Sequence, residues 1–295
     1  MNQEHDATAG QVTVVIATRG RREELCRTLG RLAALPERPP VIVVDNASDD
    51  GTARAVRERY PAVTVAEMPR NLGAAARNEG VRRARTPFVA LTDDDSWWEP
   101  GSLRRAAGLL RAHPRLALIA ASIIVEPSGQ PDPINAVMAA SPLPRDGLPG
   151  PRVLGFLACG AMVRRDAFLD AGGFCPLLFI GGEEELLAYD LAARGWDAAY
   201  VPDVVARHHP SATRDAAGRR AFEARNHALI AWLRRPAGTA LRLTAGLARR
   251  VPSEPAAARA LSGLLRCAPR VISHRRPLPA HVEAGIRVLE AGHAA

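Results

Sequence analysis

The sequence lacks the features that mark several protein classes. It contains no lysine, only 4% aromatic residues and four cysteines. No apolar run approaches the roughly 18 residues that a membrane-spanning helix needs, and residues 1–10 are polar, without the apolar segment of a secretory signal peptide. Disordered, collagen-like and disulfide-rich classes are excluded because 47% of the residues are hydrophobic and cysteines are few. We therefore expect a folded protein that stays in the cytoplasm.

The cysteines and the arginines carry little specific information. No C-x-x-C pair is present, so neither a zinc site nor a redox motif is indicated, and buried reduced thiols are the expectation. The four positions are Cys26, Cys159, Cys175 and Cys267. Because every basic residue is arginine, we attribute the bias to genome composition, which weakens any argument from a single arginine.

The net charge of +8 is concentrated at one end of the chain. Residues 231–295 contain eleven arginines and three glutamates, whereas residues 1–230 contain 28 arginines and 28 acids. A nucleic-acid enzyme would carry a positive stripe across its functional surface, so we predict no nucleic-acid partner. The basic tail could instead make a peripheral contact with the inner face of an anionic membrane. Alternatively, its helices pack on the preceding part of the chain and leave the arginines solvated.

Hydrophobic runs alternate with helical periodicity in the first hundred residues. Continuous apolar strands separated by helices indicate a mostly parallel sheet covered by helices on both faces, the α/β class. The expected strands are Val12–Ala17, Val41–Val44, Val63–Ala66 and Phe88–Leu91, and the expected helices span about 21–35, the residues after 51, and 74–84.

The second half of the chain is less regular. A helix at about 101–112 and a strand at 116–125 precede a stretch rich in Pro, Gly and Ser, which predicts a long loop, possibly a lid, over 127–151. The expected later elements are a strand at 154–163, a short helix from Asp166, a helix at 183–194 ended by Gly195, and a last strand at 198–201. Beyond residue 209 the pattern is helical, and prolines should divide it into short helices. They are Pro236, Pro252, Pro255, Pro269 and Pro277.

Polar turns follow the predicted strands, which is where open parallel sheets bind ligands. The turn Thr18–Arg21 has neither a G-x-G-x-x-G nor a Walker pattern, which argues against NAD and P-loop chemistry. The second turn begins at Asp45, whose carboxylate could accept hydrogen bonds from a ribose or base. In the same turn Ser48 or Asp49 would cap the next helix.

Three adjacent carboxylates, Asp93, Asp94 and Asp95, follow the fourth predicted strand. They would repel one another unless a cation lies between them. A hard divalent ion such as Mg²⁺ or Mn²⁺ suits one or two carboxylates together with phosphate oxygens. An acidic turn can also be merely solvated, but its place at the carboxyl end of a buried strand favours a metal site.

Taken together, these motifs resemble the family 2 glycosyltransferases of GT-A fold, over residues of about 12–212. The elements that carry the resemblance are Val14–Arg21, Val43–Thr52, Arg70-Asn71-Leu72-Gly73 with Arg77-Asn78, the Asp93–Asp95 triplet, Gly182-Glu183-Glu184 and His208. The resemblance implies a disordered segment at 1–11, a catalytic domain at 12–212 and a basic helical C-terminal extension at 213–295. Within the catalytic domain, about 12–98 would bind the nucleotide sugar and about 99–212 the acceptor.

The resemblance also implies roles for individual residues. Asp95 with Asp93 would hold Mg²⁺ or Mn²⁺ on the diphosphate of the donor, and His208 would add a metal or phosphate contact. The residues implied in donor binding are Thr18, Arg21, Asp45, Arg70, Asn71, Gly73, Arg77, Asp93 and Asp94.

Inverting transfer needs a carboxylate to deprotonate the acceptor hydroxyl. Family members commonly carry Glu-Asp at a helix start, where this chain has Glu183-Glu184-Glu185, so Glu184 takes the place of the base and Glu183 is the substitute. Glutamate is one methylene longer than aspartate, which would shift the carboxylate by roughly an ångström. Acids in a first helical turn also favour the helix dipole without any catalytic role.

The leading hypothesis is an inverting, non-processive transferase that takes a UDP-, dTDP- or GDP-linked sugar to an acceptor the sequence does not name. Processive relatives usually carry membrane helices and a Gln-x-x-Arg-Trp motif, and this sequence has neither. The alternatives are a sugar-phosphate nucleotidyltransferase and a non-catalytic nucleotide-sugar binder or membrane-surface adaptor. Trp97 and Trp98 could form an apolar wall for the acceptor, although core packing is commoner there.

Overall fold

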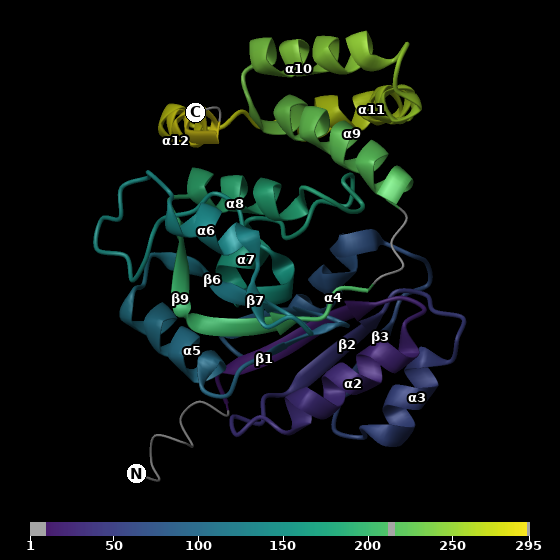
Figure 1. The fold of residues 1–295 in the computed structure, drawn as a ribbon, viewed down its shortest axis with the longest axis vertical. Helices are drawn as coiled ribbons and strands as arrows, with labels where there is room; N and C mark the ends of the chain where they lie inside the picture. Colours follow the sequence, from purple (N-terminus) through teal and green to yellow (C-terminus); the bar gives the residue numbers. More distant parts are fainter. Residues whose placement is uncertain (1–9, 212–215, 294–295) are drawn as a thin grey trace.

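The computed structural model describes residues 10–211 and 216–293. A mixed sheet with the strand order β3-β2-β1-β4-β8-β6-β9-β5 runs through the molecule, and β7 pairs with β6 at one side (Figure 1). The strands are β1 Val12–Thr18, β2 Val41–Asp45, β3 Thr64–Glu67, β4 Phe88–Asp93, β5 Ser96–Trp98, β6 Leu116–Val125, β7 Gln130–Pro131, β8 Ala161–Arg164 and β9 Asp197–His208. The predicted α/β class is confirmed. The predicted disorder of residues 1–9 lies outside the described part of the chain.

The first four strands are parallel, as their continuous apolar runs predicted. Thr18 pairs with Asp45 and Ala17 with Asp93, so the carboxyl ends of β1, β2 and β4 lie at one edge of the sheet. The remainder is mixed, because β8 is antiparallel to β4 and β6, while β9 is parallel to β6. The polar turns after β1, β2 and β4 are thereby brought together.

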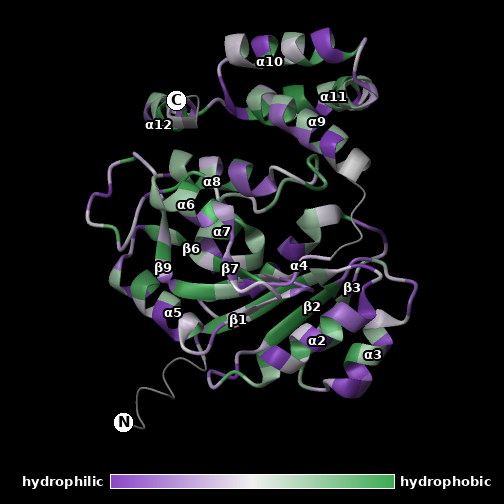
Figure 2. Ribbon diagram, viewed as in Figure 1, coloured by the Kyte–Doolittle hydropathy of each residue, from purple (hydrophilic) through white to green (hydrophobic). Residues whose placement is uncertain are grey.

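Helices cover both faces of the sheet with separate hydrophobic cores. One core contains apolar side chains of α4, α6, α7 and α8, and the other those of α2, α3 and α5. The helices are α2 Arg22–Ala33, α3 Thr52–Arg59, α4 Arg77–Arg83, α5 Ser102–Ala112, α6 Pro133–Ala139, α7 Arg165–Asp170 and α8 Glu183–Ala193, with short 3₁₀ helices at Gly73–Ala76 and Ala158–Gly160. Figure 2 shows the contrast between the hydrophobic strands β1 and β2 and the mixed surfaces of α2 and α3.

Three predictions for the second half of the chain are wrong in detail. The stretch 127–151 is not a plain loop, because Asp132 caps α6 by accepting the backbone N–H of Ile134 at 2.9 Å. The strand predicted at 154–163 is confined to Ala161–Arg164. The last strand continues past Val201 to His208, because a register shift opposite Ala121 and Ser122 accommodates Pro202, which lacks a backbone donor.

The C-terminal part consists of four helices above α8 in Figure 1. They are α9 Ala216–Arg234, α10 Ala237–Arg250, α11 Pro255–His274 and α12 Ala280–His293. Prolines lie between these helices as predicted, except that Pro269 lies inside α11. That residue is exposed, so the carbonyl left without a donor can bind water.

The C-terminal helices pack directly on the α/β part of the chain. One hydrophobic cluster joins Leu186 and Tyr189 of α8 to side chains of α9, α11 and α12. An ion pair between Arg234 and Asp190 also links α9 to α8, and both side chains are nearly buried. No helix in the described ranges is long and apolar enough to cross a membrane.

Candidate functional site

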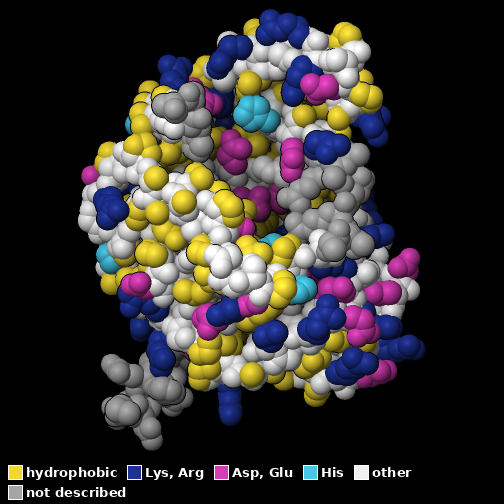
Figure 3. Space-filling view, viewed as in Figure 1, with side chains coloured by type: hydrophobic (Ala, Val, Ile, Leu, Met, Phe, Trp, Pro, Cys, Tyr) yellow, Lys and Arg dark blue, Asp and Glu magenta, His cyan; other side chains and the backbone are white. Residues whose placement is uncertain are grey.

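A cleft of about 650 Å³ lies at the carboxyl ends of β1 and β4, between the sheet and the start of α8. Figure 3 shows acidic side chains gathered in a hollow near the centre of the visible face, below the C-terminal helices. Most residues predicted to act on the donor, the metal or the acceptor line this cleft. They are Thr18, Arg21, Asn71, Gly73, Arg77, Asp93, Asp94, Asp95, Glu183, Glu184 and His208.

Two predicted donor residues do not line the cleft. The Asp45 side chain is buried, and its Oδ1 accepts the backbone N–H of Ser48 at 3.0 Å, so this carboxylate shapes the turn after β2. Arg70 is exposed to solvent, next in sequence to Asn71, which does line the cleft. The neighbouring Asn46, which the sequence did not single out, does line the cleft and bonds Asn71 at 2.9 Å.

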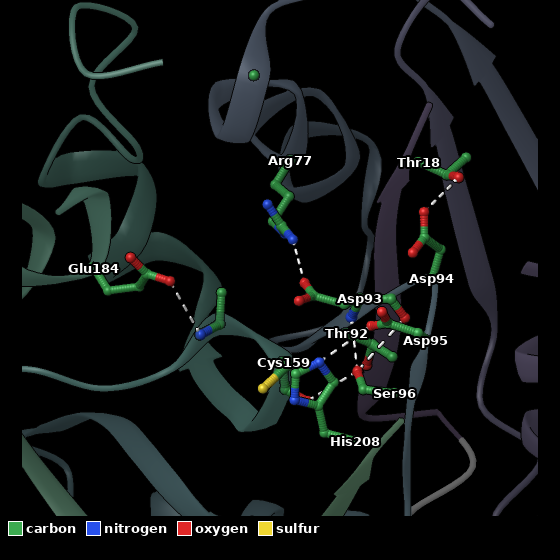
Figure 4. Close-up of polar contacts among 12 residues, drawn as sticks. Thr18, Arg77, Thr92, Asp93, Asp94, Asp95, Ser96, Cys159, Glu184 and His208 are labelled. Atoms are coloured by element: carbon green, nitrogen blue, oxygen red, sulfur yellow. Dashed lines mark hydrogen bonds and ion pairs between the residues drawn. The ribbon is translucent and has the colours of Figure 1, made fainter. Parts of the chain in front are cut away.

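The three aspartates after β4 have different partners (Figure 4). Asp93 forms an ion pair with Arg77 of α4. Asp94 accepts a hydrogen bond from Thr18 Oγ1 at 2.8 Å and lies 2.6 Å from Arg21 Nη1. Asp95 accepts from Arg21 Nη2 at 2.9 Å.

Burial and these partners shift the pKa values of Asp94 and Asp95 in opposite directions. Burial raises the pKa of Asp94 to about 7, although Arg21 and Thr18 oppose that rise. Burial would also raise the pKa of Asp95, but hydrogen bonds from His208 and Arg21 outweigh it and lower that pKa to about 2. Asp95 is therefore the carboxylate that stays ionised over the whole physiological range.

Asp93, Asp95 and His208 form a group that could hold a metal ion. One ligand atom from each residue lies within 4.8 Å of the others. Asp95 and His208 are brought together because Ser96 of β5 pairs with His208 at the end of β9. Two carboxylate oxygens and one imidazole nitrogen fit Mn²⁺ or Mg²⁺, and the open cleft leaves room for further oxygen ligands.

Across the cleft from the aspartates, α8 begins with three glutamates, of which Glu183 and Glu184 line the cleft. Gly181 and Gly182 adopt φ of 86° and 87°, which turn the chain into the helix. Glu183 is 6% exposed, and within the described chain its Oε2 has no hydrogen-bond partner. Glu184 Oε1 lies 3.4 Å from the backbone nitrogen of Ala158.

Both glutamates bind protons more tightly than ordinary carboxylates. Burial, together with the neighbouring Glu183 carboxylate, raises the pKa of Glu184 to about 8. Burial likewise raises the pKa of Glu183. Arg77 lies between Glu184 and Asp93 in Figure 4, and its positive charge opposes the pKa shifts of both glutamates. A carboxylate in this environment can accept a proton near neutral pH.

Several residues that line the cleft carried no signal in the sequence. They are Asp132, Cys159, Phe179 and Phe222, whereas Arg19 and Asn46, which also line the cleft, lie within turn motifs that carried the resemblance. The Phe179 and Phe222 rings lie 5.6 Å apart and come from the loop before α8 and from α9. No local pattern could have identified them, because they reach the cleft only through the packing of distant elements.

The tryptophan hypothesis is wrong. Trp98 is fully buried and donates from Nε1 to Thr92 Oγ1 at 2.9 Å, so it belongs to the core. Trp97 stacks against the Arg31 guanidinium, 4.0 Å from the ring centroid. Neither ring lines the cleft.

Known proteins share this fold. A mannosyltransferase from Pyrobaculum calidifontis, solved with GDP-Man and Mn²⁺, superimposes with a TM-score of 0.60 at 22% identity, covering 96% of this chain and 79% of that one. Staphylococcus aureus TarS 1–349 gives a TM-score of 0.59 at 17% identity, covering 86% and 70%. The fold is therefore of the GT-A type.

Sequence relatives point the same way. An N-acetylglucosaminyl-diphospho-decaprenol L-rhamnosyltransferase of Mycobacterium tuberculosis is 29% identical over 66% of this chain and 75% of its own length. The pre-mycofactocin glycosyltransferase of that species is 31% identical over 78% of this chain and 49% of its own length. The family model described as Glycosyl transferase family 2 matches residues 13–171, more than half of the chain. These matches decide against the nucleotidyltransferase and non-catalytic alternatives: the chain belongs to glycosyl transferase family 2 and is a glycosyltransferase.

Proposed function

We propose that this enzyme is an inverting, non-processive transferase that moves one sugar from a nucleoside-diphosphate sugar to an acceptor hydroxyl with the help of Mn²⁺ or Mg²⁺. The observation that carries the proposal is one cleft with the metal-ligating group on one wall and the Glu183–Glu184 pair on the other. The two walls are of the kinds that such a transfer requires, a site for an anionic leaving group and a proton acceptor.

On the donor side, Asp93, Asp95 and His208 would hold the ion. When bound, the ion offsets the negative charge that develops on the leaving nucleoside diphosphate. Thr18, Arg21 and Asp94 form a hydrogen-bonded wall beside it. We assign Asn71, Gly73 and Arg77 to the donor pocket as well, and leave Asp45 and Arg70 as indirect contributors outside the lining.

On the acceptor side, Glu184 is the proposed base, and Glu183 is the alternative. A carboxylate with a raised pKa is well matched to taking the hydroxyl proton as the new bond forms. Acceptor attack on the face opposite the leaving group then inverts the anomeric centre. Solved neighbours contain GDP-Man and UDP-GlcNAc, which supports UDP-, dTDP- or GDP-linked sugars as the donors to test.

Turnover of such donors with Mn²⁺, Mg²⁺ or EDTA tests the proposal. We expect Asp95→Ala to abolish transfer with the fold intact, and Glu184→Gln to lower kcat at least about a hundredfold with donor affinity nearly unchanged. Glu185→Gln is the matched control, because Glu185 lies in the same helical turn but outside the cleft lining. Full activity in EDTA would refute the metal assignment, and retention of anomeric configuration would refute inversion. Loss of activity in Glu183→Gln alone would move the base by one residue.

We also propose that α11 makes a peripheral contact with an anionic membrane, consistent with a location in the cytoplasm at the inner leaflet. Leu265 and Ile272 are 65% and 80% exposed and, being seven residues apart, lie on one face of the helix. α11 also carries Arg259, Arg266 and Arg270 and no acidic residue. Apolar side chains beside arginines suit an interface with anionic lipid headgroups.

Vesicle flotation distinguishes this contact from a purely structural role of the extension. The protein should float with vesicles containing phosphatidylglycerol at low salt and be released at high salt, while Leu265→Ser with Ile272→Ser should not float. Val137→Ser is the control, since Val137 is 46% exposed but lies on α6. If the wild-type protein ignores these vesicles, the α11 face does not bind membrane.

A further inference from the structure

The loop from Leu177 to Gly182, which leads into Glu183 and Glu184, has an unusual backbone. Three of its residues have positive φ, namely Phe179 at 64°, Gly181 at 86° and Gly182 at 87°. A positive φ costs glycine little, but for an aromatic residue it is a strained conformation that its surroundings must enforce. The question is which group holds this loop in place.

Two residues of α9, the first helix of the C-terminal extension, bond to this loop. Asn226 of α9 is 1% exposed, and its Nδ2 donates toward the carbonyl oxygens of Leu178 and Ile180, both at 2.9 Å, and of Gly181 at 2.5 Å. Its Oδ1 accepts from Arg225 Nε at 2.9 Å, which fixes the orientation of the amide. Arg225 Nη2 also donates to the carbonyls of Leu177 and Leu178 at 3.2 and 2.6 Å.

Carbonyl oxygens that converge on one point repel one another unless a donor lies between them. Here a single buried amide group donates toward three carbonyls of one short loop. The Leu178 carbonyl also accepts from Arg225 and from the backbone N–H of Ile180, so losing the amide would cost most at the carbonyls of Ile180 and Gly181. The loop conformation therefore depends on Asn226 as well as on Gly181 and Gly182.

The same loop connects the two walls of the catalytic cleft. At one end the Phe179 carbonyl accepts the backbone N–H of Ala74 at 2.7 Å, in the short 3₁₀ helix that begins at Gly73. At the other end Gly182 precedes Glu183 and accepts the N–H of Leu186 at 3.0 Å as the helix begins. A shift of this loop would displace the proposed base relative to the donor.

We propose that Asn226 is a positioning residue for transfer, which holds the Leu177–Gly182 loop so that Glu184 faces the donor. The inference rests on the proposed function for the role of Glu184, but the loop restraint itself does not. The helical extension thereby becomes part of the catalytic machinery through α9. A displacement of about 1 Å at a reacting group can cost on the order of a hundredfold in rate.

Asn226→Asp tests the inference in the full-length protein, because it keeps the shape of the side chain and replaces the donor with an acceptor facing three carbonyls. We expect kcat to fall at least tenfold, amide hydrogen exchange in residues 177–186 to accelerate at least tenfold, and Mn²⁺ affinity measured by calorimetry to stay within twofold. Thr244→Val is the matched control, since it removes the Trp232 Nε1 to Thr244 hydrogen bond of 2.9 Å within the same extension. That variant should change neither kcat nor exchange in the loop.

Unchanged exchange or a kcat within twofold of wild type in folded Asn226→Asp would overturn the inference, as would equal losses in Thr244→Val. If Asn226→Asp does not fold, Arg225→Met applies the same criteria, because it removes the bonds to Leu177 and Leu178 and leaves Asn226 in place. Failure of the proposed function would look different: the wild-type protein would show no metal-dependent transfer, while the exchange measurement would still report whether Asn226 restrains the loop.

Discussion

His208 Nε2 lies 3.4 Å from Asp95 Oδ1, although the two residues are 113 positions apart in the sequence (208 − 95). The contact arises because the last residue of β9 pairs with Ser96, the residue that follows Asp95. The backbone N–H of His209 also donates to the Asp95 carbonyl at 2.8 Å. The position of the imidazole is thus set by the sheet and not by a flexible loop.

We predict that His208→Ala raises the Mn²⁺ concentration needed for half-maximal activity at least tenfold, because it removes one of the three proposed protein ligands. His209→Ala is the control, since its neighbouring side chain is exposed and the backbone bond to Asp95 is kept. The measurement is a Mn²⁺ titration of donor turnover. Equal Mn²⁺ requirements for the two variants would remove His208 from the ligand set.

A second prediction concerns the contact of Gly73 with Phe179 in the loop before α8. Gly73 has φ of 60°, and a Cβ added there would lie 2.0 Å from the carbonyl oxygen of Phe179. Gly20 has the same φ, but nothing lies within 4 Å of its Cβ position. Both alanine variants should lose about 1 kcal/mol from the positive φ, and Gly73→Ala should lose at least as much again from the clash. Chemical denaturation measures the difference, and equal losses would mean that the Phe179 loop yields freely.

The sequence predicted the elements that follow simple periodicity. The parallel strands β1 to β4 were located within about three residues because each is a continuous apolar run between helices. The acidic triplet could be found because it follows a buried strand, and the glutamates could be found because the family resemblance pointed to that helix start. The resemblance pointed to His208, but the last strand was predicted only over 198–201, so the sequence did not show that β9 continues to His208 and brings it beside Asp95. The register shift opposite Ala121 and Ser122 shows how the strand continues past Pro202.

The residues that the C-terminal extension contributes could not be predicted from the sequence, for a different reason. Asn226 and Phe222 lie in an ordinary helical pattern, and their relevance depends on how α9 packs against the loop before α8. No spacing within α9 distinguishes a buried amide that bonds three carbonyls from one that faces solvent. Tertiary packing alone determines the difference.

The raised pKa of Glu184 leads to a prediction for the rate. If Glu184 is the base, it must be deprotonated before transfer, so kcat/KM should rise with pH, reach half of its plateau near pH 8 and level off above about pH 9. The pH dependence of kcat/KM reports the protonation of the free enzyme, in which the Glu183 and Glu184 carboxyls affect each other's pKa. Glu184→Gln should remove this rise from the residual rate, whereas Glu185→Gln should keep it. A profile that is flat between pH 6 and 9 in the wild-type enzyme would contradict the assignment of the base.

The raised pKa of Glu184 also predicts that the folded protein loses stability as the pH rises, whereas its activity should increase. The folded-state pKa of Glu184 lies above its ordinary value of 4.5, so between about pH 4.5 and 8 the unfolded chain loses this proton while the folded chain keeps it. Stability contributed by this group is therefore lost as the pH rises through that window. Glu184→Gln never ionises, so its free energy of unfolding relative to wild type should increase from pH 5 to pH 8, by on the order of 1 kcal/mol or more. Urea unfolding at the two pH values, with Glu185→Gln as the control, measures this gain. If the difference in unfolding free energy between Glu184→Gln and wild type is the same at pH 5 and pH 8, the pKa of this carboxyl is not raised by folding, and the proposed base would lose its physical basis.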